Sequence, residues 1–347
     1  MTEVRSSAAL RSVTVVAAAY NAVTWIERAI GSVVSSLEAA GIERYEVIVV
    51  NDGSTDGTGE VLDAIAATNP QVVVVHQPNA GRLAARKAAL ERATHDTTLI
   101  VDARVETFPD AFTALNRRLE TGTRNRVWNG HVTIRYGRNL FARFWGVVTH
   151  VGWHAYLRRP RFVEFGIEEF DRYPKGTGFL LAPTDLLRES MRDYDSLVDD
   201  ARFASDDTGV LRHLARKERI AITPEFGCWY DFGRSSVRAF LRHSFDRGTF
   251  FVDSYLRPGT RFFLPLIVFF VGCLASVALL ATLPVATLAA LACAWLLITI
   301  VALALRAPLG NVVAFALVLP VFALAFGAGI WRGVFLVTRT ALRRRRA

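Results

Sequence analysis

The sequence contains few cysteines and few lysines. Two of its three cysteines, Cys273 and Cys293, fall in an apolar C-terminal region, which leaves Cys228 alone. A disulfide framework or a zinc cluster needs several ligands at defined spacings, so neither is expected. The only lysines are Lys87, Lys175 and Lys217, so the formal net charge of +9 comes almost wholly from arginine. No nucleic-acid-binding module accompanies this charge, and anionic lipid or a phosphate-bearing substrate explains it better.

Charged residues are also absent from one long stretch, Phe262 to Leu305. It divides into two apolar segments, 262–283 and 284–305, each about the length that crosses a hydrocarbon core. A third apolar segment covers 312–331 and is interrupted by Pro320. We therefore expect a soluble domain over residues 1–255 and a membrane region with a basic tail over residues 256–347.

The arginines beside these segments predict their orientation. Arg257 and Arg261 precede the first segment and Arg306 follows the second, which places those ends in the cytoplasm. The N-terminal apolar run 13–19 is too short for a signal peptide core, so the soluble domain is expected to be cytoplasmic, on a multi-pass protein of the cell (inner) membrane. If the third segment crosses, the basic tail lies outside, against the positive-inside rule. If it lies along the interface, the tail can bind anionic lipid. By length alone we expect three spans.

The soluble part alternates short apolar runs with helix-like segments, which predicts an α/β fold with a mostly parallel sheet, followed by an all-α transmembrane region. The expected strands are 13–18, 46–50, 72–75 and 99–101, and the expected helices are 24–40, 57–67 and 83–93. In such sheets ligands bind beyond the carboxyl ends of the strands.

Polar loops follow all four expected strands. They are Tyr20-Asn21, the segment 51–56, the segment 78–81 and the segment 102–104. Each alone is typical of a turn or a helix cap, but four together at one sheet edge predict a ligand site. The spacing of acids from Asp52 mimics a calcium loop, yet a strand precedes it where that motif has a helix. Neither a Rossmann glycine turn nor a P-loop follows the first strand.

Four motifs together resemble the family 2 glycosyltransferases with the GT-A fold. They are "VTVVAAAYNA", "YEVIVVNDGSTDGT", "PNAGRLAARKAAL" and "TTLIVDARV", in the family's order and spacing. The resemblance covers about residues 12–250. It implies that Tyr20, Asn21 and Asp52 hold the nucleotide base, that Arg86 lies near the donor, and that Asp102 is the first acid of the Asp-x-Asp motif.

Arg104 departs from the family because it replaces the second acid, which normally contacts the metal. One alternative is that Asp102 still holds Mg²⁺ or Mn²⁺, with Glu106, diphosphate oxygens and water completing the shell. A second is that the Arg104 guanidinium, which matches phosphate geometry, replaces the ion. A third is that Arg104 points away and pairs with a surface acid.

Further motifs of the resemblance supply the remaining site residues. Asp207 matches the catalytic base and Asp206 its acidic neighbour, although the pair also suits a helix N-terminus. Gly176, Thr177 and Gly178 match the acceptor side. Arg242 and His243 occupy the place where processive synthases carry a Gln-x-x-Arg-Trp motif, which this sequence lacks. The two alternatives for them are contact with the donor diphosphate and a solvated basic face near lipid. A single-sugar transferase is therefore expected.

The expected function is an inverting transfer of one sugar from a nucleotide-diphosphate sugar to a lipid-linked or cell-envelope glycan hydroxyl at the membrane. The alternatives are a polyprenyl-phosphate sugar synthase and a catalytically silent membrane scaffold. Residues 139–157 combine apolar residues at helical spacing with arginines. This pattern indicates either an interfacial helix that guides the acceptor or an ordinary amphipathic helix packed on the domain.

Overall fold

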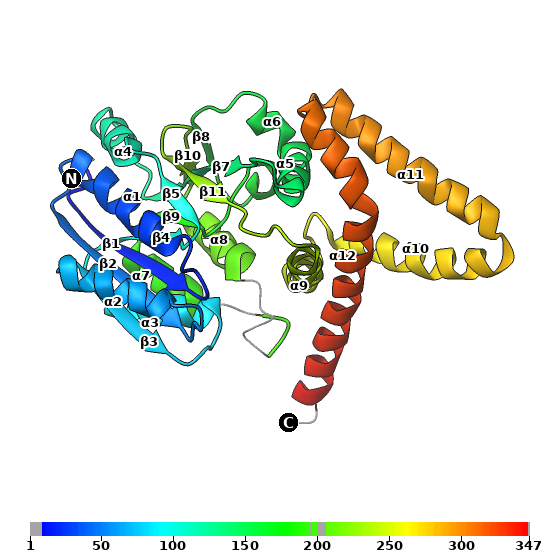
Figure 1. Cartoon of the computed structure of the whole chain (residues 1–347), viewed down its shortest axis with the longest axis horizontal. Coiled ribbons are helices and arrows are strands. Elements are labelled where there is room, and N and C mark those ends of the chain that lie inside the picture. Colours follow the sequence, from blue (N-terminus) through cyan, green and yellow to red (C-terminus); the bar gives the residue numbers. More distant parts are fainter. Residues whose placement is uncertain (1–8, 194–195, 200–205, 346–347) are drawn as a thin grey trace, which may run out of the picture. The chain divides into compact units, whose positions relative to one another are not determined.

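The computed structural model describes residues 9–193, 196–199 and 206–345 (Figure 1). By their contacts, the residues fall into two compact units. The first comprises 1–135, 158–195 and 206–232, and the second comprises 136–157, 196–205 and 233–347. The domain boundary near residue 255 stays a prediction, because contacts between helices do not define where a membrane begins.

The first unit is built on an eight-stranded, mostly parallel sheet, as predicted. Its strand order is β3-β2-β1-β4-β9-β6-β10-β8. The strands are β1 (Ser12–Ala19), β2 (Arg44–Asp52), β3 (Val72–Gln77), β4 (Thr97–Asp102), β6 (Val127–Asn129), β8 (Val163–Phe165), β9 (Phe179–Pro183) and β10 (Ile220–Ile222). The first four run parallel, and β9 is antiparallel to both β4 and β6. The four strands expected from the sequence are therefore confirmed.

Helices cover both faces of this sheet because alternate strand residues point to opposite sides. Val15 and Ala17 belong to a core with α1, α2 and α4, whereas Val16 belongs to a core with α3, α7 and α8. The helices are α1 (Ile26–Ala39), α2 (Thr58–Thr68), α3 (Arg82–Arg92), α4 (Ala111–Glu120), α7 (Thr184–Arg192) and α8 (Asp206–Lys217), with a short 3₁₀ turn, η1 (Phe170–Arg172). Strands buried on both faces explain the continuous apolar runs in the sequence.

A second, three-stranded sheet continues from the end of β4. It pairs β5 (Val105–Thr107) with β11 (Gly227–Asp231), which also pairs with β7 (His131–Arg135). The turn between β4 and β5 holds residues 103 and 104. This connection fixes where the Arg104 side chain starts.

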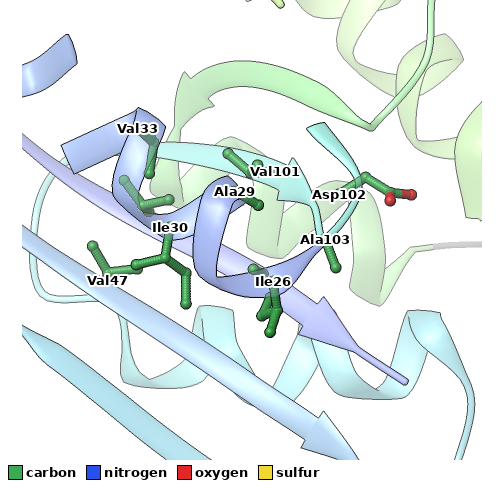
Figure 2. A pocket seen from close by; sticks show the side chains of 10 residues that line it. Ile26, Ala29, Ile30, Val33, Val47, Val101, Asp102 and Ala103 are labelled. Atoms are coloured by element: carbon green, nitrogen blue, oxygen red, sulfur yellow. The ribbon is translucent and has the colours of Figure 1, made fainter. Parts of the chain in front are cut away.

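A small pocket lies between α1 and the large sheet (Figure 2). Apart from Asp102 it is lined by aliphatic residues such as Ile26, Ile30, Val47 and Val101. In Figure 2 the Asp102 carboxylate points away from these side chains. The pocket is a packing gap in the core, and its apolar lining does not suit a sugar nucleotide.

The second unit is helical. Its helices are α5 (Leu140–Gly152), α6 (His154–Leu157), α9 (Val237–Tyr255), α10 (Phe263–Thr282), α11 (Pro284–Ala304) and α12 (Leu309–Arg344). The last three are each long and apolar enough to cross a membrane. Rings of α5 contact α9 and α12: Phe141 stacks on Phe240, and Phe144 stacks on Phe315. This packing agrees with the amphipathic pattern of residues 139–157.

Helix α12 continues through Pro320, where the sequence predicted an interruption. Proline has no N–H, so the carbonyl of Ala316, one turn earlier, loses its partner within the helix. The indole Nε1 of Trp295 on α11 donates to that carbonyl at 2.9 Å. A side chain from the neighbouring helix thus replaces the missing hydrogen bond, and the helix extends to Arg344.

Close packing of α9 on α12 depends on Gly329. A Cβ added there would overlap the Phe245 carbonyl on α9. Because backbone cannot yield as a side chain can, Gly329→Ala is expected to destabilise the protein by about 1–3 kcal/mol. Gly272→Ala on α10 is the matched control, since nothing lies within 4 Å of its Cβ position. Thermal unfolding in detergent should show a lower Tm for the first variant alone; equal Tm values would contradict this packing.

Candidate active site

The carboxyl ends of the first four strands meet at one edge of the large sheet. In register, Ala18 of β1 lies beside Asp102 of β4, and Ala19 lies beside Asn51 of β2. Asp52, at the end of β2, lies beside Gln77 of β3. The polar loops after these strands therefore begin next to one another.

Asp52 organises the loop that follows β3. It is 3% exposed, and its carboxylate accepts hydrogen bonds from Gln77 Nε2 at 2.7 Å and from the N–H groups of Ala80 and Gly81 at 2.9 Å each. Gly53 comes next with φ +72°, and a Cβ there would lie 2.6 Å from the Asn79 nitrogen. Only glycine allows the loops after β2 and β3 to approach this closely.

Tyr20 and Asn21 follow β1 and remain accessible. Tyr20 is 54% exposed. Asn21 has φ +49°, a conformation that asparagine tolerates better than most residues. Its Oδ1 accepts from the Thr55 N–H at 2.9 Å, and its own N–H donates to Ser54 Oγ at 3.0 Å. These bonds tie the loop after β1 to the loop after β2.

Asp102 and Arg104 form an ion pair across the β4–β5 turn. Asp102 Oδ1 accepts from the Arg104 N–H at 3.0 Å and lies 3.3 Å from Arg104 Nε. Burial alone would raise the pKa of Asp102, but the charges of Arg104, Arg82 and Arg86 and the Arg104 N–H outweigh it and hold this pKa well below its usual range. Arg104 therefore pairs with Asp102 itself, and not with a surface acid.

Glu106, proposed as a second metal ligand, has other partners. Its carboxylate lies 3.1 Å from Arg28 Nε and 3.0 Å from Arg135 Nη2. The hydrogen bond from Arg135 is the main cause of a lowered pKa at Glu106. This carboxylate thus neutralises two arginines of the small sheet and α1.

Thr177 joins Arg86 of α3 to Asp207 of α8. Arg86 is 2% exposed; its Nη1 donates to Thr177 Oγ1 at 2.6 Å, and its Nη2 lies 3.3 Å from the Thr177 carbonyl. The Thr177 hydroxyl in turn donates to Asp207 Oδ1, which lies 3.7 Å from Arg86 Nη1. A buried guanidinium, a hydroxyl and a one-third-exposed carboxylate thus form one connected group, the Arg86–Thr177–Asp207 cluster.

Residues 176–178 also contact the end of β4. The Gly178 carbonyl accepts from the Asp102 N–H at 2.8 Å. The Gly176 carbonyl accepts from Asn129 Nδ2 at 2.6 Å. The segment 176–178 therefore connects the Asp102–Arg104 pair with the Arg86–Thr177–Asp207 cluster.

The remaining predicted site residues are Asp206, Arg242 and His243. Asp206 begins α8, but its side chain lies outside the described residues. Arg242 and His243 lie on α9 in the second unit, where the His243 ring contacts Trp145. The role of Asp206 beside the catalytic base and the role of Arg242 and His243 in donor binding stay predictions.

The sequence prediction missed Arg82, the first residue of α3. Its Nη2 lies 3.9 Å from Asp207 Oδ2, and its charge also lowers the pKa of Asp102. Arg82 and Arg86 are four residues apart and so share one helix face. That spacing was the available signal.

One further group of metal-type ligands exists among the described residues: Glu189, Asp193 and His213. Glu189 is already ion-paired with Lys217, and His213 Nε2 lies 3.4 Å from the same carboxylate. All three lie on or directly after α7 and α8, and none is a predicted site residue. The ammonium group competes with any cation there.

A family model named "Glycosyl transferase family 2" matches residues 14–185. That range contains β1–β4, the four polar loops, and residues 176–178. Residues 14–185 belong to glycosyl transferase family 2. The resemblance drawn from the sequence is thereby confirmed for this family 2 domain.

Curated relatives align over short segments. The uncharacterized glycosyltransferase YibD of Escherichia coli is 40% identical over 70 residues, which is 20% of each protein. Dolichyl-phosphate beta-glucosyltransferase ALG5C of Trichomonas vaginalis is 35% identical over 115 residues, 32% of this chain and 34% of ALG5C. These matches thus span a fifth to a third of the relatives' length.

A solved structure supports the fold over most of the chain. Mannosyltransferase PcManGT from Pyrobaculum calidifontis, in complex with GDP-Man and Mn²⁺, superposes with a TM-score of 0.51. The superposition covers 91% of this chain and 88% of PcManGT at 18% sequence identity. Similarity at this level supports the architecture and says nothing of the substrate.

Proposed function

We propose that the chain transfers one sugar from a nucleotide-diphosphate sugar to a hydroxyl of a membrane-associated acceptor, either lipid-linked or a cell-envelope glycan. The observation that carries this proposal is the Arg86–Thr177–Asp207 cluster, which lies beside the Asp102–Arg104 pair within one α/β domain. In the first, Asp207 is a carboxylate held in place to accept a proton. In the second, the Arg104 guanidinium is held in place to donate hydrogen bonds to a leaving diphosphate.

The proposed step is a single inverting displacement. Asp207 takes the proton of the acceptor hydroxyl as its oxygen attacks sugar C1 from the face opposite the nucleotide. The C1–oxygen bond to the diphosphate breaks, and its electron pair leaves with the nucleoside diphosphate. Tyr20, Asn21 and Asp52 hold the nucleotide base, and residues 176–178 face the acceptor.

The donor groups around Asp102 fit a divalent ion poorly. Arg104 occupies Asp102 Oδ1, Glu106 is paired with two other arginines, and the charges of Arg82 and Arg86 also act on Asp102. Mg²⁺ and Mn²⁺ prefer oxygen ligands and are repelled by nearby guanidinium groups. We therefore assign stabilisation of the leaving diphosphate to the arginines, Arg104 first, and retain an ion on Asp102 as the alternative to be tested.

The membrane helices support a membrane-associated acceptor. Helices α10 and α11 are flanked by Arg257, Arg261 and Arg306, which favours the cytoplasmic side for those ends. On this proposal the catalytic domain works at the cytoplasmic leaflet of the cell (inner) membrane.

A polyprenyl-phosphate sugar synthase is the second candidate. The similarity to ALG5C favours it. So do Arg86 and Arg82, 3.7 and 3.9 Å from Asp207, because guanidinium groups suit a phosphate acceptor. A phosphate is already ionised and needs no general base, so the two candidates differ in their dependence on Asp207.

A screen of nucleotide sugars tests the proposed function. The full chain in detergent is incubated with each radiolabelled donor and a membrane lipid and glycan extract, and products are separated. We expect one donor class to label an acceptor through an alkali-stable glycosidic bond. Label on a polyprenyl phosphate would favour the second candidate. If no nucleotide sugar is either transferred or hydrolysed, both candidate functions are contradicted.

Thr177→Val is expected to reduce turnover by about ten- to a hundredfold, because Asp207 loses the hydroxyl that positions it. The buried Arg86 also loses an acceptor, which costs roughly 1–3 kcal/mol of stability. Thr177→Ser keeps the hydroxyl and should recover most of the turnover. Steady-state kinetics and chemical unfolding of both variants check this; a serine variant as impaired as the valine variant would contradict it.

A further inference from the structure

The N-terminal part of α12 is held by α5. Phe315 and Phe322 of α12 lie 5.4 and 4.8 Å from Phe144 of α5, measured between ring centroids. Just before α12, the Leu305 carbonyl accepts from His150 Nε2 of α5 at 2.9 Å. The beginning of α12 therefore lies against a helix that connects two strands of the first unit.

The middle of α12 is held by α9. Arg332 donates to Asp246 at 2.7 Å and to Thr249 Oγ1 at 2.7 Å, and the two helices approach closely at Gly329. In the most apolar stretch of α12, a third of the residues are buried inside the protein, compared with 6% for α10 and 11% for α11. Helix α12 is thus covered by other helices to an extent that α10 and α11 are not.

The C-terminal end of α12 is held by residues 196–199. Thr340 Oγ1 accepts from the Asp199 N–H at 3.3 Å, and Arg344 Nη2 lies 3.0 Å from Asp199 Oδ1. Asp253 of α9 also fixes this segment, because it accepts from Ser196 Oγ at 3.0 Å and from the Leu197 N–H at 2.7 Å.

Both segments that hold the ends of α12 lie on one side of the membrane. In the sequence, helix α5 lies between β7 and β8, and residues 196–199 lie between α7 and α8. These four flanking elements, β7, β8, α7 and α8, all belong to the first unit. Neither segment is flanked by the ~20 apolar residues that a crossing requires. A 36-residue helix is about 54 Å long, so a crossing α12 would separate its ends by the whole ~30 Å hydrocarbon core. The contacts at both ends forbid that.

Helix α12 also has an apolar stripe that suits a lipid surface. Its large exposed apolar residues recur mostly every three, four or seven positions along one face: Leu309, Val313, Leu317, Val321, Leu324, Trp331, Phe335 and Leu342. The stripe continues beyond the most apolar stretch of α12 into the arginine-rich end. The second unit contains sixteen arginines and four aspartates, whereas the first contains 25 basic and 28 acidic residues. The positive charge that attracts anionic lipid is thus concentrated beside this helix.

We infer that α12 does not cross the bilayer. It lies along the membrane surface on the side of the catalytic domain, where its apolar stripe and basic end contact anionic lipid, and α10 and α11 are the crossing pair among the described helices. The two spans return the chain to its starting side. This satisfies the positive-inside rule, which three spans violate.

Cysteine labelling tests this topology without relying on activity. In a background carrying Cys273→Ala and Cys293→Ala, single variants Ala341→Cys on α12, Leu283→Cys in the α10–α11 turn and Glu60→Cys on α2 report three positions; Cys228 is buried. A membrane-impermeant maleimide is applied to intact cells and to inverted vesicles. We expect Ala341→Cys to label together with Glu60→Cys, and Leu283→Cys to label from the opposite side. Labelling of Ala341→Cys together with Leu283→Cys would overturn the inference.

Two further measurements keep the inference falsifiable if a cysteine variant does not fold. With fusions at the C-terminus, we expect a fluorescent protein to fluoresce and alkaline phosphatase to be inactive. The reverse pattern would contradict the inference. For the lipid contact, the full chain in nanodiscs should be cleaved by trypsin at the α12 end severalfold more slowly with phosphatidylglycerol than with phosphatidylcholine alone. Equal rates would exclude a contact with anionic lipid.

Discussion

Asp207→Asn is expected to lower turnover by about 10²- to 10⁴-fold, the range that a general base contributes. Asparagine keeps the shape and can still accept the Thr177 hydroxyl, but it cannot take the proton of an acceptor hydroxyl. Donor binding should change little, so the loss should appear in kcat and not in KM for the nucleotide sugar. Steady-state transfer assays in detergent measure both constants.

The matched control is Asp185→Asn on α7, whose side chain is 98% exposed. It makes the same chemical change on the same domain and should retain full turnover. Full turnover in Asp207→Asn with a hydroxyl acceptor would contradict the assigned base. Retained turnover with label on polyprenyl phosphate would instead support the synthase candidate.

Arg104→Ala is expected to lower turnover by about 10²- to 10³-fold, comparable to the loss of one donor to a developing anion. The Arg104 guanidinium is ion-paired with Asp102, and Arg104 Cζ lies 5.1 Å from the centre of the Tyr230 ring. These two contacts hold the guanidinium in position before the donor binds. Arg104→Lys keeps the charge but not the forked geometry and should recover only part of the turnover. Arg126→Ala is the control, because the Arg126 side chain is 62% exposed and is ion-paired with Glu218.

Chelation separates the arginine account from the metal account. With EDTA present, wild-type turnover should remain within a few-fold of its untreated value. If EDTA abolishes transfer and added Mn²⁺ restores it, while Arg104→Ala stays active, then Asp102 holds a divalent ion and the guanidinium does not replace it.

Much of the first unit was predictable because its core strands have a simple signature. Runs such as residues 47–50 are buried on both faces, which leaves no polar alternation, and they end directly in Asp52 or Asp102. Parallel pairing then brings those ends to one edge. The site edge follows from these two facts, and the family match agrees with it.

The partners of individual side chains were less predictable, because they depend on contacts between distant segments. Thr177 joins Arg86 and Asp207 across 91 and 30 residues of sequence, and nothing local indicates it. The pairing of Glu106 with Arg135 depends on the three-stranded sheet, whose strands are far apart in the chain. The continuation of α12 through Pro320 likewise depends on Trp295, a residue of another helix.

Titration calorimetry with UDP and GDP on the full chain in detergent tests the central claim most directly, namely that the loops after β1–β4 form one nucleotide-sugar site. We predict saturable binding of at least one of these nucleotides. Binding should be strongly weakened by Asp52→Ala but not by Asp63→Ala, an exposed acid on α2 paired with His76. Absence of binding for both nucleotides, or equal binding by the two variants, would contradict the account.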